Sequence, residues 1–138
     1  MKTVYSTAAA LALALTAGSA LADDHGPMVK AMDQDVSNGM VSAAAVSAPE
    51  NGWLVVHRTD ADMKPGPVVG HAPLRAGMTE DVAAILTEDV KSGEMLMLMV
   101  HSEAGGMKTG IFEYTLGAKE DGPIKPGGNL VMQVITAK

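Results

Sequence analysis

The chain has 138 residues, a formal net charge of −6 and no cysteine. The absence of cysteine excludes disulfides, zinc–thiolate and blue-copper sites, cysteine-held iron–sulfur clusters and thioether-linked haem. The acidic balance disfavours nucleic acids and anionic lipid surfaces as partners. The composition and length are those of a single ordinary domain.

The first segment, residues 1–22, has the three parts of a secretory signal peptide. Met1-Lys2 gives a positive start, Ala8–Gly18 is an uncharged apolar run, and Ala20-Leu21-Ala22 is an A-x-A cleavage site. The apolar run is shorter than the roughly 20 residues that a membrane-spanning helix needs. We therefore expect cleavage after Ala22, no membrane insertion, a periplasmic or secreted location, and one domain over residues 23–138.

The remainder of the chain predicts a series of short strands separated by turn signals such as SNG and PENG. About seven or eight strands at this spacing are typical of an all-β sandwich. Trp53, the only tryptophan, opens the segment with the strongest β-propensity and is predicted to anchor the core. The expected strands cover residues 28–34, 40–48, 53–59, 68–74, 94–101, 111–116 and 129–137.

Residues 80–91 fit two kinds of element. Apolar residues from Val82 to Val90 have the spacing of a helix face, and Gly93 would end such a helix. The stretch DVAAIL fits a strand equally well, so the pattern alone leaves both structures open.

Three stretches, GWLVVHRTDADMKPGPVVGHAPLRAG, LMVHSEAGGMKTGIFEY and EDGPI, resemble a domain of unknown function found in exported bacterial and archaeal proteins. This chain has Glu103 where many members carry Asp two residues after a motif histidine. The resemblance implies a small exported immunoglobulin-like or cupredoxin-like β-sandwich, implies no reaction, and favours a strand for residues 80–91. The matching segments are Gly52–His57, Gly70–Gly77, Met99–His101, Gly110–Tyr114 and Asp121–Pro123.

The stretch EMLMLMVH places thioethers and an imidazole on one side of a strand. Because side chains alternate between the two faces, Met95, Met97, Met99 and His101 share a face. Thioether and imidazole ligands suit Cu(I), which predicts a metal site around Met99 and His101. The alternative is that the methionines fill a core that has few aromatic side chains.

Two further histidines are candidates to complete this site. His57 ends the stretch WLVVH, and His71 lies in VVGHAP. If the strands of His57 and His101 are adjacent and antiparallel, we expect the two histidines at opposite ends. If these strands run parallel across the sandwich, the histidines can meet. A structural histidine with satisfied hydrogen bonds is the alternative for both His57 and His71.

Cleavage after Ala22 would also create a metal-binding amino terminus. Asp23-Asp24-His25 would supply the terminal amine, backbone amides and an imidazole nitrogen, a planar nitrogen set that suits Cu(II) or Ni(II). This motif needs no folded structure, so a chance histidine near the cleavage site is the alternative explanation.

The chain has no nucleophile elbow, zinc-protease motif, phosphate-binding glycine loop or dinucleotide fingerprint. We therefore expect no enzymatic activity. The functional hypothesis is a periplasmic binding protein for copper or another late transition metal, held by methionine and histidine. The alternative is a structural or protein-interaction module with a methionine-rich core and no metal; the sequence identifies no protein partner.

The signal-peptide pattern predicts that the mature protein begins at Asp23. Mass spectrometry of the protein recovered from the periplasm measures this terminus directly. A mature terminus at any other residue would remove the amino-terminal copper motif.

Overall fold

A computed structural model describes residues 26–138, which form seven β-strands and one short 3-10 helix. No helix in this described part is long and apolar enough to cross a bilayer. The elements in chain order are β1 (Met28–Lys30), β2 (Met40–Ala48), β3 (Gly52–Thr59), β4 (Val68–Leu74), β5 (Gly77–Leu86), β6 (Met95–Ser102), η1 (Pro126–Gly128) and β7 (Met132–Thr136).

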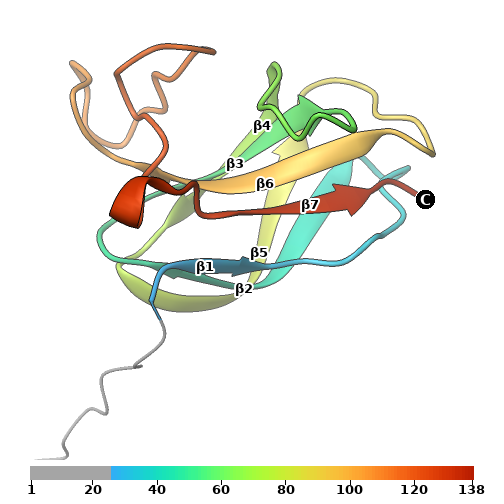
Figure 1. Ribbon diagram of the computed structural model, residues 1–138, viewed down its shortest axis with the longest axis horizontal. Helices are drawn as coiled ribbons and strands as arrows, with labels where there is room; N and C mark the ends of the chain where they lie inside the picture. The colour runs from blue at the N-terminus through green and yellow to red at the C-terminus, as the bar shows by residue number, and fades with distance from the viewer. Residues whose placement is uncertain (1–25) are drawn as a thin grey trace, which may run out of the picture.

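The strands form one antiparallel sheet in the order β1-β2-β5-β4-β3-β6-β7. The sheet curves so that β1 also contacts β6 and β7, and an isolated bridge joins Gln34 to Ala137. Figure 1 shows β1 and β2 lying across from β6 and β7. The result is a nearly closed, barrel-like sandwich, which confirms the predicted all-β fold.

The inner core of this barrel is aliphatic. Alternate residues of β3 and β6, including Leu54, Leu96 and Leu98, point inward and are fully buried. Among the described residues, this inner cluster contains no methionine and no aromatic side chain. The methionines of β6 therefore do not fill the inner core. Those that are buried lie on the other, outer face of the sheet.

Residues 80–91 are largely strand, as the family resemblance favours. β5 extends over Gly77–Leu86 and pairs with β2 along most of its length. β4 and β5 pair only at Gly70 with Leu86 and at His71 with Ile85. A side chain at Gly70 would come within 2.8 Å of the carbonyl oxygen of Ile85, so glycine permits this close approach where the sheet turns its corner.

The prediction of a strand over residues 111–116 is wrong. This stretch pairs with no strand, because its backbone is held by a side chain: the Glu113 N–H donates to the Asp121 carboxylate at 2.8 Å. Within this stretch Tyr114 is buried and Ile111 is exposed. The predicted strands 28–34 and 129–137 also shorten, to β1 and β7.

Residues 103–124, here named the covering segment, lie over the part of the outer face of β3 and β6 that holds Trp53, His57 and His101. Figure 1 shows this segment in orange beyond the end of β6. Trp53 is 6% exposed, and its ring lies edge-on to His71 at 5.6 Å and to Phe112 at 5.5 Å between centroids. Trp53 is thus buried as predicted, but it anchors this outer layer and not the inner core.

We predict that Trp53→Ala lowers the free energy of unfolding by about 3–5 kcal/mol, because it empties the centre of the outer layer. Urea unfolding monitored by far-UV circular dichroism measures the loss. Trp53→Phe should retain a large part of the stability, since it keeps a ring at this position. A loss below about 1 kcal/mol for the alanine variant would show that the layer does not depend on this side chain.

Candidate functional site

The rings of His57 and His101 meet on the outer face of the sheet. Their strands are adjacent and antiparallel, and the pair of Val55 with Met99 lies between them in the register. Although roughly 13 Å of strand separates the two positions, the Nε2 atoms are 3.3 Å apart and the ring centroids 5.4 Å apart. The expectation that adjacent antiparallel strands keep these histidines apart is therefore wrong, because the side chains extend toward each other along the strands.

The other nitrogen of each ring fixes its tautomer. Nδ1 of His57 lies 2.7 Å from the carbonyl oxygen of Gly66, and Nδ1 of His101 lies 2.7 Å from that of Asp121. A carbonyl oxygen only accepts hydrogen bonds, so each Nδ1 must carry a hydrogen. A neutral imidazole has a single N–H, which leaves both Nε2 atoms with bare lone pairs. At 3.3 Å these lone pairs repel each other unless a cation lies between them.

Burial keeps both imidazoles neutral near pH 7. His57 is fully buried and His101 is 1% exposed. Desolvation lowers the pKa of His101 to about 4, although its bond to the Asp121 carbonyl opposes the shift and the neighbouring His57 adds to it. Desolvation also lowers the pKa of His57. The neutral imidazole is the form that binds metal ions, so no proton has to leave before an ion can bind at neutral pH.

Asp121 joins the covering segment to the histidine pair. Its carbonyl accepts from His101, and its buried carboxylate accepts from the backbone N–H groups of Ala104 at 3.1 Å and Glu113 at 2.8 Å. Its own N–H donates to the Ala104 carbonyl at 2.8 Å. Asp121 has a φ of 46°, a left-handed conformation that aspartate tolerates better than most residues. The orientation of His101 is thus tied to the fold of the covering segment.

Aromatic rings separate the pair from water. Tyr114, 8% exposed, lies edge-on to His101 at 4.6 Å and to His57 at 5.9 Å between centroids. The Phe112 ring lies 6.4 Å from that of His101. Trp53 Nε1 is, within the described part of the chain, the one buried side-chain polar atom that lacks a hydrogen-bond partner. The burial of His57, His101 and Tyr114 keeps bulk solvent away from the two Nε2 atoms.

The structure brings together three of the predicted ligands, His57, His101 and Met99, and separates the others. Met99 is fully buried and lies between the two histidines in the register. His71 is exposed and stacks on Phe112 at 4.4 Å. Met95 is half-buried at the far end of β6, opposite Thr59. The proposed amino-terminal ligands Asp23, Asp24 and His25 lie outside the described residues.

Sequence reasoning missed the groups that orient the pair. The carbonyl acceptors of Gly66 and Asp121 are backbone groups, which side-chain patterns cannot predict. Tyr114 lies in a stretch whose pattern predicts a strand. One signal was available: four of the five segments that resemble the family, Gly52–His57, Met99–His101, Gly110–Tyr114 and Asp121–Pro123, contribute to this site. Their convergence at one place was not inferred from the sequence.

The pair could hold an ion only with a small ligand set. Residues 26–138 contain no group of three or more His, Cys, Asp or Glu side chains that could bind a metal. The available donors are two imidazoles, with the Met99 thioether beside them in the register. With metal–nitrogen bonds of about 2.0 Å, nitrogens 3.3 Å apart subtend an angle of about 110° at the ion. This geometry suits a bent ligand pair that a third donor completes.

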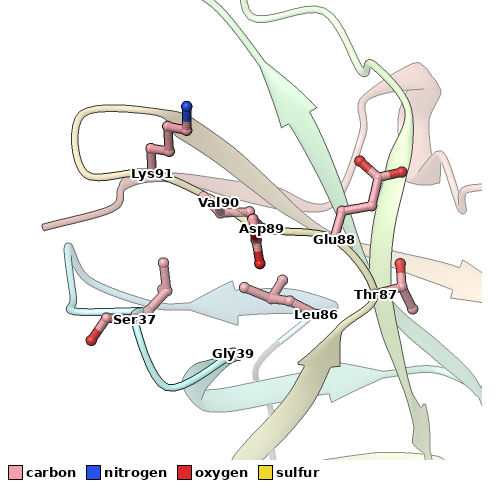
Figure 2. A pocket seen from close by; sticks show the side chains of 9 residues that line it. Ser37, Gly39, Leu86, Thr87, Glu88, Asp89, Val90 and Lys91 are labelled. Atoms are coloured by element: carbon pink, nitrogen blue, oxygen red, sulfur yellow. The ribbon is translucent and has the colours of Figure 1, made fainter.

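A surface hollow lies elsewhere on the molecule. It has a volume of about 590 Å³ and is lined by Val36, Ser37, Gly39 and residues 86–91, without histidine or methionine. Figure 2 shows the side chains of Glu88 and Lys91 directed away from Leu86. Arg58 holds the adjacent turn by bonds to Glu88, Glu94 and the Asp89 carbonyl. This hollow has a concave shape but no set of side chains that could bind one ligand together. The histidine pair therefore remains the better candidate site.

We predict that the metal-free protein loses stability as the pH falls from about 6.5 to about 4. The unfolded chain protonates its histidines near pH 6.5, whereas the folded state resists protonation of His101 until its lowered pKa of about 4. The free energy of unfolding should drop by about 3 kcal/mol through this group, at about 1.4 kcal/mol per pH unit.

Urea unfolding at several pH values measures this slope, and His101→Gln, which cannot titrate, should show a smaller one. If the wild-type protein instead gains stability relative to His101→Gln below pH 6.5, a shared proton bridges the two rings.

Residues 27–138 match a family described as a domain of unknown function, DUF7282. The match includes every described strand and both histidines of the pair. No curated protein and no solved structure is detectably similar to the chain. The chain therefore belongs to the DUF7282 family, which confirms its resemblance to a domain of unknown function.

Proposed function

We propose that this protein is an exported, non-enzymatic binding protein that holds Cu(I) between His57 and His101. The observation that carries the proposal is the approach of two bare Nε2 atoms to 3.3 Å while both Nδ1–H groups donate to backbone carbonyls. Histidines that bind metals commonly donate their other ring N–H to a carbonyl or carboxylate, which fixes the tautomer. Both rings of this pair have that arrangement.

The donor set favours Cu(I) over other ions. Mg²⁺ and Ca²⁺ require oxygen ligands, which do not converge on this pair. A structural Zn²⁺ site takes a full tetrahedral set, whereas this site offers two imidazoles and the neighbouring thioether of Met99. Soft thioethers select Cu(I). All of these donors are neutral, and a singly charged ion costs less to bury among them than a divalent one.

The alternative function is a structural or protein-interaction module without metal. Exposed apolar side chains in the covering segment favour it, since such side chains gathered on a surface mark contact sites. Met107 is 91% exposed, and Ile111 and Leu116 are also exposed. In this alternative the methionines of β6 serve only to pack the outer layer.

Cu(I) titration against a chromogenic Cu(I) chelator tests the proposal. The starting protein carries His25→Ala, so that the amino-terminal motif does not contribute copper. We expect this protein to take up Cu(I), and His57→Gln and His101→Gln to weaken binding by more than about 100-fold, since even an outer-shell change at a metal site costs about 10–100-fold. Glutamine is chosen because both rings are buried, and circular dichroism checks that each variant folds.

His71→Gln is the matched control. It removes an imidazole from the same face of the sheet but not from the pair, so affinity should not change. Met95→Leu should likewise leave binding unchanged because Met95 lies at the far end of the strand. If the His25→Ala protein binds Cu(I) no more tightly than free methionine does, the folded site does not exist and the interaction module takes its place.

A further inference from the structure

The proposed site is sealed, which raises the question of how an ion reaches it. His57 and Met99 are fully buried, and His101 and Tyr114 are nearly so. Carbonyl groups of Gly66 and Asp121 occupy the outer nitrogens of both rings. An ion therefore has to approach the pair along the sheet, past the residues that flank Met99.

The edge strand β7 lies beside Met99. In the pairing of β6 with β7, Met132 lies directly opposite Met99, so the two side chains share the outer face. Cross-strand neighbours on one face have Cβ atoms roughly 4.5–5.5 Å apart, and methionine side chains are long and flexible enough to bring their sulfur atoms together. Met99 is fully buried, whereas Met132 is 37% exposed. The two thioethers thus extend from the buried pair to the surface.

Met132 also borders a surface hollow that contains a second thioether. The hollow has a volume of about 330 Å³ and lies between β1 and the segment that leads into β7. Its lining includes Met28 and Met132, and Asn129 is its only residue with a polar side chain. No acidic or basic residue lines it, so it offers little to a hard, hydrated cation and two sulfur donors to a soft one.

We propose that Met132, with Met28 beside it, captures Cu(I) at the surface and delivers it to Met99 and the histidine pair. This inference rests on the proposed function. The transfer is a ligand exchange: the bond from copper to the Met132 sulfur breaks as the bond to the Met99 sulfur forms. The ion keeps its charge and no proton moves, because thioethers have none to release and the Nε2 atoms are already bare.

Stopped-flow transfer of Cu(I) from a chromogenic chelator to the full-length mature protein carrying His25→Ala tests this role. Met132→Leu should slow uptake about tenfold, which corresponds to about 1.4 kcal/mol in the activation free energy. Equilibrium affinity should stay within about twofold, since the histidine pair sets it; this is less than about 0.4 kcal/mol. Leucine has a volume close to that of methionine, so the fold should tolerate the change.

Met40→Leu is the matched control, because Met40 is similarly exposed at 41% but lies on β2, away from Met99. It should leave the uptake rate unchanged. Equal uptake rates for Met132→Leu and Met40→Leu would overturn the assignment of Met132 while leaving the histidine site intact. A loss of affinity at Met132→Leu as large as that at His101→Gln would also overturn it, since Met132 would then be a ligand of the final site. Failure of the starting protein to bind Cu(I) at all would refute the proposed function itself.

Discussion

The need to cover the apolar outer face of β3 and β6 is the constraint on which the rest of the structure depends. β6 buries Leu96 and Leu98 on the inside of the barrel and Met97 and Met99 on the outside, so neither face can be left in water. Each such side chain contributes about 1.5–3 kcal/mol when fully buried. The covering segment meets this need without a paired strand, and its backbone N–H groups therefore require other acceptors. The carboxylate of Asp121 supplies two of these contacts.

The two histidines are the polar exception within this apolar layer. Three contacts around them each need a hydrogen or a cation, and two neutral rings supply only two hydrogens. In a water-excluded layer an unmatched lone pair is more costly than at the surface. The same aromatic cover that excludes water thus raises the cost of the repulsion between the two Nε2 lone pairs. This is why the pair, and not the hollow beside Leu86, is the place where a ligand is expected.

Much of the fold could be predicted from turn signals and from the alternation of apolar residues, because alternation within a strand shows which residues share a face. The shared face of Met97, Met99 and His101 follows from parity alone, and the structure confirms it. The approach of His57 to His101 could not be predicted, because it depends on the register between strands that are distant in sequence and on the direction in which each ring extends. The hydrogen bond from His101 to the Asp121 carbonyl could not be predicted either, because its acceptor is a backbone group. Residues 111–116 misled the prediction because residue types that favour strands also occur here in a segment that is held by a carboxylate and pairs with no strand.

β6 and β7 are neighbours in the sheet, yet residues 103–131 stand between them in the chain. Such a connection is a large insertion in what would otherwise be a hairpin. Since the entropy of closing a loop grows only slowly with its length, the barrel tolerates changes here far better than changes within its strands. The two parts consequently share the site: the barrel strands carry the two imidazoles, and the inserted segment orients His101 through Asp121 and determines what surrounds the pair. Altering that segment offers a route to new specificity that leaves the barrel's own strand pairing unchanged.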